Sequence, residues 1–113
     1  MNARLPSGVL VGALIRRANH EGGIATVLVR GDQDAGAILV VTLDRGTNPK
    51  VWERGLGPDG KPRLLPVGPQ DLVPEAEVTA YWQRRRSRDA DLWVVELDIV
   101  SAERFAAETI AAG

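Results

Sequence analysis

Three short strand-like runs follow one another in the first half of the chain, two rich in β-branched residues and the third alternating as a half-buried strand does, and they constrain its fold more than any other feature. They span residues 24–30, 37–43 and 50–54, and none has the helical period of 3.6 residues. The segments between them are rich in Gly, Asp, Asn and Pro, which favour turns. Connections this short join antiparallel strands, so we predict a hairpin from the first two runs and a meander that continues into the third.

Helical patterns flank these runs. Residues 8–21 place apolar side chains on one stripe, with Ser7 in the N-cap position. A second helix is predicted to begin at Pro74, with acidic residues in its first turn, where the helix dipole favours them. Between the meander and this helix, residues 63–65 are expected to return as a short edge strand that Pro66 ends.

The end of the chain predicts one more strand and one more helix. Residues 92–100 alternate as a strand, with Trp93 and Val95 on one face, and the tail from Ser101 has helical spacing. The fold class is therefore α+β: a small antiparallel sheet of four or five strands, a meander plus a last strand, with two helices packed on one face and a C-terminal helix. We expect a single domain over residues 1–100 and a helical extension over 101–113.

Several classes of chemistry are excluded by composition. The chain has no cysteine, so disulfides, thiolate metal sites and cysteine nucleophiles are absent. It has a single histidine, His20, so metal sites built from several imidazoles are excluded as well. His20 falls on the predicted solvent side of the first helix, away from a serine that it would have to activate. We expect no catalytic residue, no metal and no cofactor. A small acid/base enzyme stays open only because the last turn and strand carry Asp89, Asp91, Glu96 and Asp98.

The longest apolar stretch near the start, residues 8–15, is too short to cross a membrane, which takes about 20 residues. It runs directly into Arg16 and Arg17, and no signal-peptidase pattern follows. We expect a cytoplasmic protein without membrane contact.

Two motif matches are interpreted as turns. Residues 55–60, GLGPDG, fit the glycine pattern of dinucleotide-binding loops, but a turn and not a helix follows them. Residues 32–36 open like a calcium loop, yet Ala37 and Leu43 occupy the places that need a glycine and a bidentate acid.

An arginine cluster at residues 84–88 is the strongest local charge feature. Together with Arg16 it could form a phosphate-binding patch, so nucleic-acid binding remains an alternative. Acidic residues follow the cluster directly, and the net charge is −1. Arg85 differs from its neighbours because it shares a stripe with Tyr81 and Trp82, so it needs a carboxylate partner. Asp89 and Asp91 are the nearest candidates, and Glu96 is a more distant one.

The segment DADLWVVE at residues 89–96 resembles the closing motif of domain-of-unknown-function family 1491, a group of short proteobacterial proteins. Residues 13–17, 30–32 and 35–37 match that family in the same order, and the resemblance covers about residues 4–98. It implies a small α+β domain and supplies no activity. Its motif positions are either structural or part of a binding surface: Arg17, Arg30, Asp91, Trp93 and Glu96.

The function that these observations favour is a non-catalytic protein-interaction or self-associating module. An exposed sheet edge would provide the contact, with a protein partner or a homo-oligomer as the product. The alternatives are a nucleic-acid-binding accessory protein and a small enzyme with acid/base carboxylates. The candidate binding residues are Arg16, Arg17, Arg30, Arg84, Arg85, Arg86, Arg88, Asp91, Trp93 and Glu96.

Overall fold

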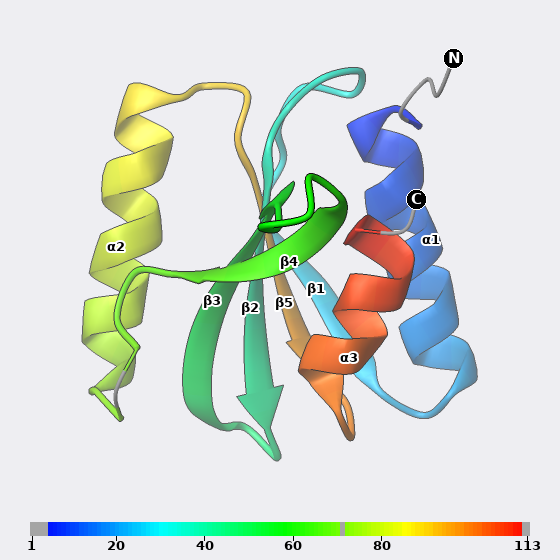
Figure 1. Cartoon of the computed structure of the whole chain (residues 1–113). Coiled ribbons are helices and arrows are strands. Elements are labelled where there is room, and N and C mark those ends of the chain that lie inside the picture. The colour runs from blue at the N-terminus through cyan, green and yellow to red at the C-terminus, as the bar shows by residue number, and fades with distance from the viewer. Residues whose placement is uncertain (1–4, 71, 112–113) are drawn as a thin grey trace.

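The structure is a computed structural model that describes residues 5–70 and 72–111. Its strands form one mixed sheet of five, in the order β1-β5-β2-β3-β4 (Figure 1). The predicted α+β class is confirmed. The elements are α1 (Ser7–His20), β1 (Ile24–Val29), β2 (Ile38–Asp44), β3 (Thr47–Leu56), β4 (Pro62–Val67), α2 (Glu75–Arg88), β5 (Trp93–Asp98), α3 (Ala102–Ala106) and a π-helical turn (Ala107–Ala111).

The predicted hairpin between the first two runs is wrong, because β5 lies between them. β5 pairs antiparallel with β1 and parallel with β2, so the sheet is mixed rather than antiparallel. The burial of the strands gives the physical reason. β2 and β5 are buried along most of their length, whereas residues of β1 alternate between exposed and half-buried. The most apolar strands take the centre, and the long connection through α2 allows the parallel pairing.

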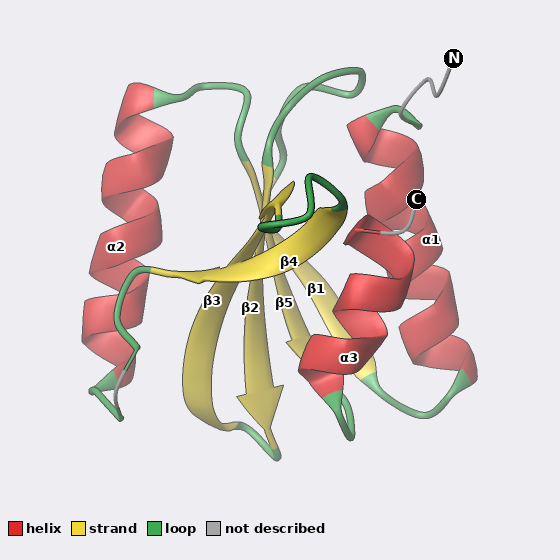
Figure 2. Ribbon diagram, viewed as in Figure 1, coloured by secondary structure: helices red, strands yellow, loops and turns green. Residues whose placement is uncertain are grey.

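Helices cover both faces of the sheet (Figure 2). α1 and α3 pack against the face that carries Val40 and Val95, and α2 packs against the face that carries Leu39 and Val94. The prediction that the first two helices share one face is therefore wrong. Consecutive apolar residues in β2 and β5 point to opposite faces, and both sets need a cover.

Two strands, β3 and β4, are longer than predicted. β3 begins at Thr47 because Arg45 and Gly46, with φ of 52° and 78°, form a two-residue hairpin turn. β4 continues through Pro66 to Val67, which an edge strand tolerates because one side of it has no ladder to maintain.

The C-terminal residues pack on the domain. Phe105 and Ile110 belong to the same buried cluster as α1. The Arg17 guanidinium lies 4.4 Å from the centre of the Phe105 ring, and it donates hydrogen bonds to Thr109 Oγ1 and Glu108 Oε1. No helix in the described part of the chain is long and apolar enough to span a membrane.

Candidate functional site

β1 is one of the two edge strands of the sheet, and it exposes large apolar side chains. β5 pairs with one side of β1, setting Ile24 opposite Asp98 and Thr26 opposite Glu96. Within the described residues, no strand pairs with the other side. Ile24 is 66% exposed and Leu28 is 37% exposed, so this edge offers large apolar side chains next to unpaired backbone groups.

The two edges of the sheet are protected very differently. β4, with the sequence PRLLPV, carries Pro62, Pro66 and a positive charge at Arg63. Prolines and charges are the usual means by which an edge strand avoids pairing with another chain. β1, with the sequence IATVLV, has neither. Its one irregularity is a register shift between Val27 and Val29, which leaves residues 24–27 as a regular strand.

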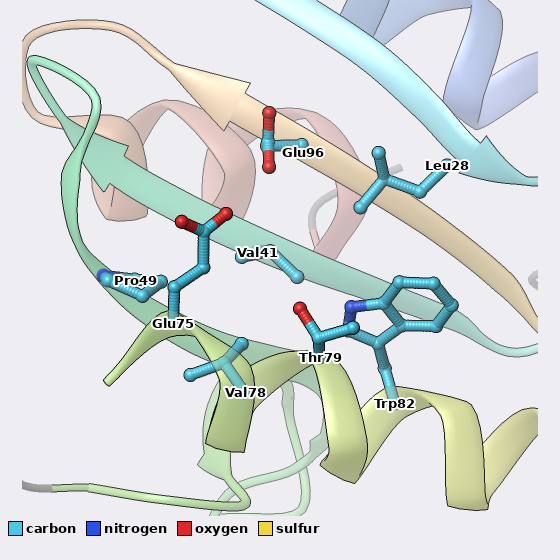
Figure 3. A pocket seen from close by; sticks show the side chains of 8 residues that line it. All are labelled: Leu28, Val41, Pro49, Glu75, Val78, Thr79, Trp82 and Glu96. Atoms are coloured by element: carbon cyan, nitrogen blue, oxygen red, sulfur yellow. The ribbon is translucent and has the colours of Figure 1, made fainter. Parts of the chain in front are cut away.

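A hollow of about 160 Å³ lies beside β1 on the α2 face (Figure 3). Leu28 of β1 and Trp82 of α2 approach each other across it, over a floor that includes Val41. Glu75 reaches from α2 towards the strand that carries Glu96. The hollow is therefore apolar at one end and acidic at the other.

Glu96 is the acid of this hollow whose proton affinity the structure alters. Half-burial raises the pKa of the Glu96 carboxyl above its usual range, and repulsion from Glu75 and Asp98 adds to the effect. In the described ranges, no group of three or more His, Asp or Glu side chains is placed to hold a metal ion.

A second hollow, of about 280 Å³, flanks β1 on the α1 face. Its wall includes Val27 and Arg30 from the β1 side, Gly12 from α1 and Trp93 from β5. Two of the candidate residues, Arg30 and Trp93, thus meet here although they are far apart in the sequence.

The loop after β1 is joined firmly to the start of β5. The Trp93 indole Nε1 donates to the Asp32 carbonyl at 2.6 Å, and the Asp32 amide donates to the Asp91 carbonyl at 3.0 Å. A Cβ on Gly31 would lie 2.2 Å from the Asp91 oxygen, and one on Gly36 would lie 2.0 Å from it, so only glycine fits at either position. Trp93, Asp91 and the glycines of this loop therefore build the joint that positions the end of β1.

The motif interpretations of this region agree with the structure. The Asp32 carboxylate accepts hydrogen bonds from the amides of Asp34 and Ala35, which is a turn rather than a cation site. Residues 57–61 form the hairpin loop between β3 and β4, as predicted for the glycine-rich stretch. The predicted N-cap is wrong: Pro6 is the N-cap of α1, Ser7 is its first residue, and the Ser7 hydroxyl donates to the Gly36 carbonyl.

The predicted partner of Arg85 is wrong. Its guanidinium binds Glu53 of β3 through two hydrogen bonds of 2.8 and 3.1 Å and also donates to the Tyr81 hydroxyl. The ion pair therefore connects α2 to β3 and not to the turn before β5. Glu53 was missed because the long-range pairing of α2 with β3 has no local signal in the sequence.

The remaining arginines do not form one patch. Arg84 and Arg88 are exposed on α2, whereas Arg16 lies on α1, against the opposite face of the sheet. Arg86 turns towards the end of β1, where its guanidinium approaches the Arg30 carbonyl at 3.5 Å. The positive charges that the sequence groups together are thus distributed over three parts of the surface.

The fold and this site define a small α+β domain whose mixed sheet is covered on both faces and has two edge strands, of which only β4 carries prolines and a charge. The chain belongs to the family described as protein of unknown function (DUF1491), whose model matches residues 5–107. A search among curated proteins gives no match.

Three solved structures are similar to this chain over most of its length. A crystal structure of a DUF1491 family protein from Caulobacter crescentus is 33% identical, with a TM-score of 0.78, and covers 94% of this chain and 97% of its own. A solution structure from A. tumefaciens is 31% identical, with a TM-score of 0.69, and covers 86% and 87%. An NMR structure of a DUF1491 family protein from Caulobacter crescentus is 35% identical, with a TM-score of 0.70, and covers 85% and 86%.

Proposed function

We propose that this domain is a protein-interaction module that binds an extended polypeptide segment as an additional strand along β1. The observation that carries the proposal is the contrast between the two edges of the sheet. Prolines and an arginine protect β4 against pairing with another chain, whereas β1 is an exposed edge strand without charge or proline.

When a polypeptide segment adds to the sheet as a strand, both its backbone and its side chains are recognised. The unpaired amides and carbonyls of β1 provide affinity, and pockets for alternate side chains provide specificity. β1 has a hollow on each face, with Leu28 in the wall of one and Val27 in the wall of the other. An added strand would direct its alternating side chains to these two sides of the sheet.

A pair of short peptides tests this function without a known partner. The probe is the acetylated, amidated pentapeptide TVTVT, and its matched control is the same peptide with every amide nitrogen methylated. Methylation removes the donors that strand pairing needs and keeps the side chains. The readout is the change in amide NMR chemical shifts on titration into the isotope-labelled domain.

We expect the unmodified peptide to shift the amides of residues 24–28 in a saturable manner and the methylated peptide to leave them unchanged. Equal responses to both peptides, or shifts that fall on β4 instead, would overturn the proposal.

A further inference from the structure

We infer that the segment that β1 binds is β1 of a second copy of this chain, in antiparallel orientation about a two-fold axis next to Thr26. This inference rests on the proposed function and names its partner. It follows from the charges at the two ends of β1, which have opposite signs on both faces of the sheet.

On the α2 face, negative charge lies at the start of β1 and positive charge at its end. Asp98 and Glu96 stand beside Ile24 and Thr26 in the register with β5. At the other end, the Arg86 guanidinium reaches the Arg30 carbonyl. An antiparallel neighbour would bring its positive end beside this negative one.

The α1 face repeats the pattern. Arg30, which is exposed, follows the end of β1 and lines the hollow on this face. Glu21, also exposed, ends α1 just before β1 begins, with the Arg17 guanidinium 3.8 Å from its carboxylate. In the antiparallel pair, Arg30 of each copy lies next to Glu21 of the other.

The orientation and the composition of the strand both favour a second copy. Parallel pairing would set like charges together at both ends, which is unfavourable. Antiparallel pairing sets Thr26 opposite Thr26 of the partner subunit and Ile24 opposite the partner's Leu28. These exposed apolar side chains then cover one another, and a two-fold interface needs this self-complementarity.

Sedimentation equilibrium of the full chain tests the inference, over loading concentrations from about 10 to about 500 µM. The wild type is expected to be a reversible dimer. Thr26→Lys places two like charges face to face at the axis and is expected to raise the dissociation constant at least tenfold. The new lysine has Glu96 as its neighbour on β5, so the fold is retained. Gln83→Lys adds the same charge on the exposed surface of α2 and is the matched control, which is expected to dimerise as the wild type does.

A charge exchange tests the orientation. Arg30→Glu is expected to weaken the dimer, and the combined change Arg30→Glu with Glu21→Arg is expected to restore it. Circular dichroism of each variant verifies the fold. A wild type that stays monomeric up to the highest concentration would overturn the inference, as would a Thr26→Lys variant that dimerises unchanged. If the wild type is monomeric and the unmodified peptide still binds β1, the second copy is the wrong partner and the strand-binding function stands.

Discussion

The Arg85–Glu53 ion pair joins α2 to β3 beside the apolar packing of that helix on the sheet, and we expect its removal to give a measurable loss of stability. The pair is bidentate, and its side chains are 31% and 24% exposed. The hydrogen bonds to Glu53 raise the pKa of the Arg85 guanidinium above its usual value, so the guanidinium keeps its positive charge.

The loss of unfolding free energy expected on breaking this ion pair lies between two limits. An exposed ion pair contributes about 0–1 kcal/mol, and breaking a fully buried one costs about 3–5 kcal/mol. For a half-buried bidentate pair we expect Glu53→Gln to lower the free energy of unfolding by about 2 kcal/mol. In a domain of this size, that corresponds to a melting temperature lower by about 8 °C.

A double-mutant cycle isolates the pair. The free energy of unfolding is measured by urea denaturation for Glu53→Gln, Arg85→Met and the double variant, and a coupling energy of at least about 1 kcal/mol is expected. The exposed pair Arg63–Asp59, at 3.3 Å with side chains 55% and 43% exposed, is the matched control, and its coupling should be much weaker because solvent screens the two charges. Equal coupling in the two pairs, or an Arg85→Met variant as stable as the wild type, would show that the ion pair does not hold α2.

Two further predictions concern the joint at the end of β1 and the acidic hollow. Gly31→Ala should lower the free energy of unfolding by about 2 kcal/mol, because its Cβ would meet the Asp91 carbonyl. Gly12→Ala is the control: Gly12 lies inside α1 and faces only the flexible Arg16 side chain, so this change should raise the free energy of unfolding by about 0.5–1 kcal/mol in the same urea titration. Glu96→Gln should raise the melting temperature at neutral pH, because a pKa raised in the folded state means that ionised Glu96 costs stability above that pKa. This advantage should vanish as the pH falls below the ordinary glutamate value of 4.5, and melts that show it unchanged in acid would refute the assignment.

The elements of this fold were predictable because their signals are local. The apolar stripe of α1, the start of α2 after Pro74 and the face of β5 with Trp93 all follow from spacing and turn chemistry. The order of the strands was not predictable in this way. It depends on which strands are apolar on both faces, and β5 comes from the far end of the chain to lie between β1 and β2.

The candidate site was only partly predictable for the same reason. The motif residues Arg30, Asp91 and Trp93 are brought together by the fold, and an open sheet edge was expected. Which edge is open depends on the insertion of β5. The contrast between IATVLV and PRLLPV was visible in the sequence, but it acquires meaning only once β1 and β4 are known to be the outer strands.

An isotope-filtered NOE experiment on a mixture of labelled and unlabelled chains tests most directly whether β1 is the pairing edge. Intermolecular NOEs between backbone protons of residues 24–28 are expected, with Thr26 close to Thr26 of the partner subunit. Intermolecular NOEs that come only from β4 or the helices, or none at a concentration of about 500 µM, would contradict the pairing of β1 with β1 of a second copy.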